Sequence, residues 1–115
     1  MDAQQLATEW RVLFDKFLKA SEQVRMLSEQ LRADSIRLSR ADKDNKLNFL
    51  FNIHTRIDAN THARKMYYVY TIKTALRLNE IQREIIATEA PEAHVITAEL
   101  SALLHAQLGP LPDAH

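Results

Sequence analysis

Two histidines and an aspartate stand four residues apart in the middle of the chain, at His54, Asp58 and His62. If this stretch is helical, residues four apart project from one face, with their Cβ atoms about 5–6 Å apart. Imidazole and carboxylate groups at that spacing can bind zinc, nickel or copper. The triplet is therefore a candidate metal site that needs a further ligand from another helix or subunit. The competing interpretation is a row of solvated polar side chains.

Other patterns that carry catalysis are missing from the sequence. Helical carboxylate-bridged metal proteins use Glu-x-x-His pairs, but the residues three before the first four histidines are Phe, Ala, Pro and Ala. The chain has no cysteine, and its one glycine leaves no glycine-rich loop to hold a phosphate. Ser21, Ser28 and Ser35 recur every seven residues and share one helical face, which we interpret as exposed surface or a close contact with a neighbouring helix. We expect no cofactor, no small-molecule substrate and no enzymatic activity.

Three tyrosines and several cations follow the histidines. Arg64, Lys65, Tyr68, Lys73 and Arg77 could form a basic surface on which cations bind phosphates and a ring stacks on bases. The alternative is that the neighbouring tyrosines, at positions 67 and 70, belong to the core while the cations form its polar rim. No helix-turn-helix spacing or RNA-binding consensus accompanies the cluster, so nucleic acid is the second of our functional hypotheses.

Charge is distributed unevenly although the formal net charge is zero. Residues 32–77 carry ten basic and four acidic side chains, whereas residues 78–115 carry one basic and six acidic side chains. A basic middle and an acidic end can neutralise each other when the chain folds back, or one of them can face a charged partner. We favour mutual neutralisation.

Apolar residues in the first third of the chain recur in alternating steps of four and three. This is the heptad spacing typical of a helix that buries one seam against other helices. Asp34 interrupts the pattern, and the polar run 41–46 is the first break at which a new helix could start. We predict a helix over residues 3–40. The heptad residues are Leu6, Trp10, Leu13, Phe17, Ala20, Val24, Leu27 and Leu31.

Two further helices are predicted after this break. The second covers residues 44–88, as one helix or as two that meet at 58–61; we prefer one, because the gap has neither Pro nor Gly. Pro91 separates it from a third helix over residues 91–108, which stops at Gly109-Pro110. We expect one helical domain over residues 1–109 and a disordered tail at 110–115.

These elements predict an all-α fold, a long antiparallel helical hairpin plus a short third helix. Three helices of such unequal length cannot cover one another, so we expect dimerisation to complete a bundle. The chain is accordingly interpreted as a protein-interaction module, such as an adaptor, chaperone, inhibitor or complex subunit. It has no leader-like N-terminus and no long apolar run, so we expect a cytoplasmic protein without a membrane span. The candidate association residues are Trp10, Leu13, Phe17, Val24, Leu27, Leu31, Tyr67, Leu78 and Ile81.

Overall fold

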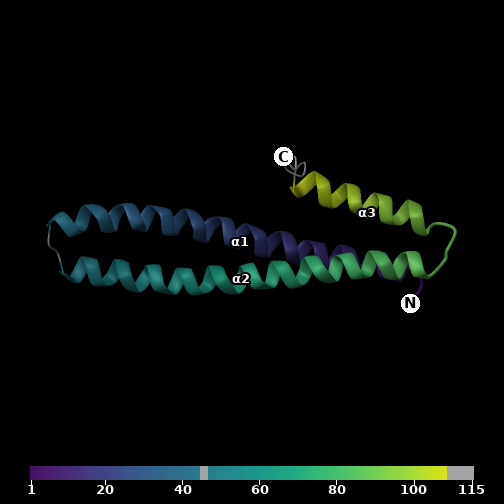
Figure 1. Cartoon of the computed structure of the whole chain (residues 1–115), viewed down its shortest axis with the longest axis horizontal. Helices are drawn as coiled ribbons and strands as arrows, with labels where there is room; N and C mark the ends of the chain where they lie inside the picture. The colour runs from purple at the N-terminus through teal and green to yellow at the C-terminus, as the bar shows by residue number, and fades with distance from the viewer. Residues whose placement is uncertain (45–46, 109–115) are drawn as a thin grey trace, which may run out of the picture. The chain divides into compact units, whose positions relative to one another are not determined.

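The computed structural model describes residues 1–44 and 47–108, with the backbone alone at residues 41–44 and 108. Within these ranges the chain forms three helices, α1 (Ala3–Asp44), α2 (Leu47–Ala87) and α3 (Ala93–Leu108), and no strand (Figure 1). The predicted all-α class is confirmed. The tail predicted at 110–115 lies outside the described residues.

The first helix begins at a pair of reciprocal hydrogen bonds. The Gln5 backbone N–H donates to Asp2 Oδ1 at 2.8 Å, and the Asp2 N–H donates to Gln5 Oε1 at 2.9 Å. This capping box satisfies two N–H groups that the first helical turn leaves free. At its other end α1 continues to Asp44, four residues beyond the predicted end at residue 40. Asp and Asn terminate helices only weakly in the absence of Gly or Pro.

The second helix runs without interruption through residues 58–61. It ends at Ala87, after which Glu89 has a φ of 57°, in the left-handed region that glycine usually occupies at a helix C-terminus. The Ala90 N–H donates to Thr88 Oγ1 at 3.3 Å in the turn that follows. Pro91 forms part of a turn, and α3 starts at Ala93, two residues later than predicted.

The structure contains two compact units. The first, which we call the capped unit, comprises residues 1–15 and 75–115 and therefore parts of α1 and α2 together with α3. The indole of Trp10 stacks on the Phe14 ring with the ring centroids 4.8 Å apart. All three helices contribute to its core, whose buried apolar residues are Ala3, Leu6, Ala7, Trp10, Phe14, Leu78, Ile81, Ile85, Ala93, Ile96 and Leu100.

The second unit, which we call the hairpin unit, comprises residues 16–74. Its two helical segments are antiparallel: Gln30 contacts Asn60, and Asp34 contacts Arg56, so residue numbers rise on α1 as they fall on α2. Its buried apolar residues are Phe17, Ala20 and Ile53 alone among those described. The hairpin unit therefore leaves much of its apolar surface uncovered by the described chain.

Candidate functional site

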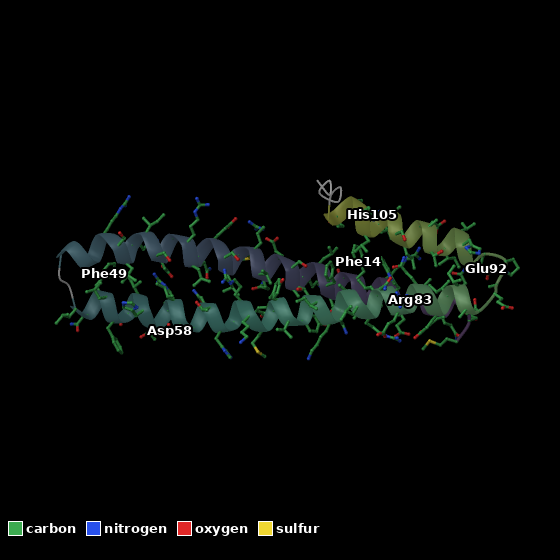
Figure 2. All side chains as sticks on the ribbon, viewed as in Figure 1. Phe14, Phe49, Asp58, Arg83, Glu92 and His105 are labelled. Carbon is green, nitrogen blue, oxygen red and sulfur yellow. The ribbon has the colours of Figure 1, made fainter. Side chains whose placement is uncertain are left out.

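The residues of the predicted metal triplet are not gathered into a metal-binding group within the described chain. His54, Asp58 and His62 are all exposed on α2, where Figure 2 labels Asp58. The described residues contain no group of three or more His, Asp or Glu side chains placed to hold a metal ion. Metal binding through this triplet would still require a further ligand from a second subunit, and it stays a prediction. One exposed face of a single helix brings no fourth ligand, and the competing interpretation as solvated side chains fits the observed exposure.

The predicted association residues separate into two groups. Trp10, Phe17, Leu78 and Ile81 are buried within their own chain and serve as core. The remaining heptad residues on α1, which are Leu13, Val24, Leu27 and Leu31, are only partly covered, and Tyr67 on α2 retains 40% of its surface exposed. The part of the predicted stripe that stays open therefore lies mainly in the hairpin unit.

Tyr67 is partly exposed although it lies on the side of α2 that carries buried residues. Its neighbours one turn further along α2, Thr71 and Thr74, are buried, and their hydroxyls donate to the backbone carbonyls of Tyr68 and Tyr70 at 2.7 and 2.6 Å. Tyr70 lies three residues from Tyr67 on the same flank of α2 and is 42% exposed. Other large apolar side chains exposed in this unit are Met26, Ile36, Leu47, Phe49, Phe51, Met66, Tyr68, Val69 and Ile72.

One partly buried ion pair, between buried Asp34 and half-exposed Arg56, joins the two helices of the hairpin unit. Arg56 donates from Nε to Asp34 Oδ2 at 2.8 Å and from a terminal nitrogen to Oδ1 at 2.5 Å, and Arg37 adds a contact of 3.3 Å to Oδ1. These guanidinium hydrogen bonds lower the pKa of Asp34, and the same bonds raise the pKa of Arg56. Asp34 is almost fully buried. It can replace an apolar residue of the heptad pattern because Arg56 neutralises its charge.

One member of the predicted basic set, Arg77, is already paired with carboxylates. Arg77 donates to Glu84 at 2.9 Å, to Glu9 at 3.1 Å and to Glu80 at 3.3 Å, and these hydrogen bonds raise its pKa. A guanidinium shared among three carboxylates is neutralised and has little capacity left for a phosphate. The other four members of the set, Arg64, Lys65, Tyr68 and Lys73, all belong to the hairpin unit, and the Lys73 side chain is exposed.

Three members of the basic set, Arg64, Lys65 and Tyr68, line a hollow between the two helices of the hairpin unit. Its volume is about 510 Å³, within the range of small-molecule sites. Val24 and Ser28 of α1 and Thr61 of α2 complete the lining. Periodicity alone did not reveal this hollow, because it depends on which residues of α1 lie opposite Thr61–Tyr68.

Comparison with known proteins gives no match, since no family model, no curated protein and no solved structure is similar to the chain. Among the described residues, no helix is both long enough and apolar enough to cross a membrane.

Proposed function

We propose that the chain is a non-enzymatic protein-interaction module, and that a second copy of the same chain binds to its hairpin unit. The supporting observation is the incomplete cover of the hairpin seam, in which Tyr67 and Tyr70 stay about two-fifths exposed beside buried positions on the same helix. Exposed apolar surface of this kind commonly marks sites of association.

The charges of the two units favour contact between the hairpin unit of one copy and the capped unit of a second copy. The hairpin unit contains twelve basic and six acidic side chains, a formal charge of +6, whereas the capped unit contains three basic and nine acidic side chains, a formal charge of −6. Pairing two hairpin units would bring like charges together, at an electrostatic cost. The basic hairpin unit of one copy is instead complementary to the acidic capped unit of another.

The capped unit offers suitable groups for such a contact. Glu89 and Glu92 are exposed, and neither forms an ion pair within the described residues (Figure 2 labels Glu92). Leu76 and Val95 in the same unit are each 61% exposed and supply apolar surface. Both units thus combine exposed apolar side chains with net charges of opposite sign.

Sedimentation at two salt concentrations tests this arrangement. We expect a dimer at micromolar protein in about 50 mM NaCl and weaker association in about 500 mM NaCl, because salt screens exposed charges beyond a few ångströms. A chain that stays monomeric at about 100 µM in low salt contradicts self-association, since specific complexes of ordinary strength form well below that concentration. Association that strengthens with salt would instead indicate pairing of two basic hairpin units and contradict the proposed contact.

A pair of variants locates the surface. Replacing Tyr67 and Tyr70 by serine should weaken dimerisation about tenfold or more, because buried tyrosines are frequent energetic centres of interfaces. Ile72→Ser is the matched control, since Ile72 is 44% exposed but lies on another flank of α2. Equal loss of dimer in the tyrosine variant and the control would show that the tyrosine flank is not the interface. Circular dichroism of each variant checks that the helices are retained.

A further inference from the structure

The hollow in the hairpin unit lies on a different flank from Tyr67 and Tyr70. Tyr68 follows Tyr67 directly, and adjacent residues of a helix point about 100° apart. Ser28 approaches from α1, and Thr61, Arg64 and Lys65 lie on α2. The hollow is therefore separate from the surface to which we assign self-association, and an inference about it does not depend on that proposal.

A small side chain keeps the hollow open. Ser28 is one of three serines spaced seven residues apart, and it lies one turn from Val24 on α1. Its hydroxyl donates to the Val24 backbone carbonyl at 2.8 Å, so it is held against its own helix. A leucine at this position would extend into the space between the helices. The serine satisfies its own hydrogen bond without filling that space.

The lining of the hollow carries positive charge that the chain does not neutralise. Arg64 and Lys65 form no ion pair within the described residues, and the lining contains no acidic side chain. The nearest acids along α1, Glu22 and Glu29, are both bound by Arg25, which lowers the pKa of Glu22. Two cations at one opening whose lining contains no carboxylate favour a bound anion.

Hydroxyl groups add further donors at the same place. The side-chain hydroxyls of Thr61 and Tyr68 make no hydrogen bond within the described residues. Each can donate to an oxygen anion, as can the guanidinium of Arg64 and the ammonium of Lys65. Val24 and the face of the Tyr68 ring supply an apolar wall beside these donors. This combination suits a phosphate group attached to a flat organic body.

We propose that the hollow lined by Ser28, Thr61, Arg64, Lys65 and Tyr68 binds the phosphate of a nucleotide-sized phosphate ester. Arg64 and Lys65 bind the phosphate oxygens, the two hydroxyls orient it, and the Tyr68 ring lies against the flat part of the ligand. The phosphate can belong to a free mononucleotide or to one nucleotide of a single strand, and the recognition chemistry is the same in both cases.

Calorimetric titration with adenosine 5′-monophosphate, adenosine, inorganic phosphate and a short single-stranded oligonucleotide tests the proposal. The mononucleotide should bind at least tenfold more tightly than adenosine, because charge-assisted hydrogen bonds to the phosphate carry most of the affinity. It should also bind more tightly than inorganic phosphate, which lacks the flat body. Equal binding of mononucleotide and adenosine, or no binding of any phosphate compound at low salt, overturns the proposal.

Three variants distinguish the hollow from general positive charge. Ser28→Leu fills the space while keeping every cation, and Arg64→Ala removes a phosphate ligand; each should reduce mononucleotide affinity about tenfold or more. Lys73→Ala removes an exposed cation outside the hollow and should leave affinity unchanged. Retained binding in Ser28→Leu, with its helicity intact, overturns the hollow as the site.

The oligonucleotide distinguishes the two sources of phosphate. A mononucleotide and an oligonucleotide that both depend on Ser28 and Arg64 support one site that accepts either ligand. An oligonucleotide that binds without any mononucleotide binding, and that is weakened as much by Lys73→Ala as by Arg64→Ala, indicates cations that follow a strand over the surface. That result contradicts the proposed site.

Discussion

The capped unit and the hairpin unit are built from the same two helices but differ in how completely they bury an apolar seam. In the capped unit α3 contributes Ala93, Ile96 and Leu100 to a core that also encloses Trp10. The hairpin unit has two helical segments and only three buried apolar residues among those described. The unit that contains the sixteen-residue helix α3 thus has a larger apolar core than the unit that contains two helical segments alone.

Several of the buried residues in the hairpin unit are polar and form hydrogen bonds. Asp34 is paired with Arg56 across the two helices, and the buried hydroxyls of Thr71 and Thr74 are satisfied by carbonyls of their own helix. Such contacts satisfy buried polar groups but supply less driving force than apolar burial. The hairpin unit is therefore the better location for both proposed binding surfaces.

Core truncation should give the largest difference between the two units. Trp10→Ala removes a fully buried indole and should lower the free energy of unfolding by about 3–5 kcal/mol, whereas Ile53→Ala in the hairpin unit should cost about 2 kcal/mol. Urea denaturation measures both. Trp10→Phe is a useful control, because the indole Nε1 is buried with no hydrogen-bond partner and its loss removes no bond. Equal costs for the two alanine variants would contradict the contrast between a closed and an open core.

The ion pair between Asp34 and Arg56 should have an intermediate effect that depends on pH. Asp34→Asn should lower the Tm by about 4–8 °C at neutral pH, corresponding to roughly 1 kcal/mol of lost charge-assisted hydrogen bonding. Because folding lowers the pKa of Asp34 below its ordinary value of 3.8, the stabilisation is present above that pH and is lost as the pH falls below it. The difference between wild type and variant should therefore shrink in acid. Asp58→Asn, which changes an exposed acid on α2, should move the Tm little at any pH.

The turn between α2 and α3 should show the smallest effect, and in the opposite direction. Glu89→Gly should raise the free energy of unfolding by about 0.5–1 kcal/mol, because glycine adopts the left-handed conformation without the Cβ clash. Glu92→Gly is the matched control, since Glu92 has no positive φ, and we expect it to be neutral or destabilising. Thermal unfolding of both variants measures the effect. A stabilised Glu92→Gly or a destabilised Glu89→Gly would contradict the assignment of strain to position 89.

Periodicity and helix-breaking residues predicted the helices because these signals are local. The heptad spacing from Leu6 to Leu31 predicted α1, the lack of Pro and Gly predicted an unbroken α2, and Pro91 marked the turn before α3. Contacts between different helices could not be predicted from such local signals. The partner of Asp34 lies twenty-two residues away on another helix, and the hollow depends on Ser28 lying opposite Arg64. The capped unit likewise buries Ala93, Ile96 and Leu100 of α3, and no repeat in α1 or α2 encodes where that third helix docks.

The contact between Asp34 and Arg56 also restricts how the two helices of the hairpin unit can align. Two apolar heptad stripes would tolerate sliding past each other by seven residues, since leucine meets leucine in either alignment. Here a slide of that size would separate Asp34 from Arg56 and break both hydrogen bonds between them, leaving Asp34 its 3.3 Å contact to Arg37 of its own helix. One acidic residue thus selects a single longitudinal alignment of the helices, much as a lone buried asparagine does in a coiled coil.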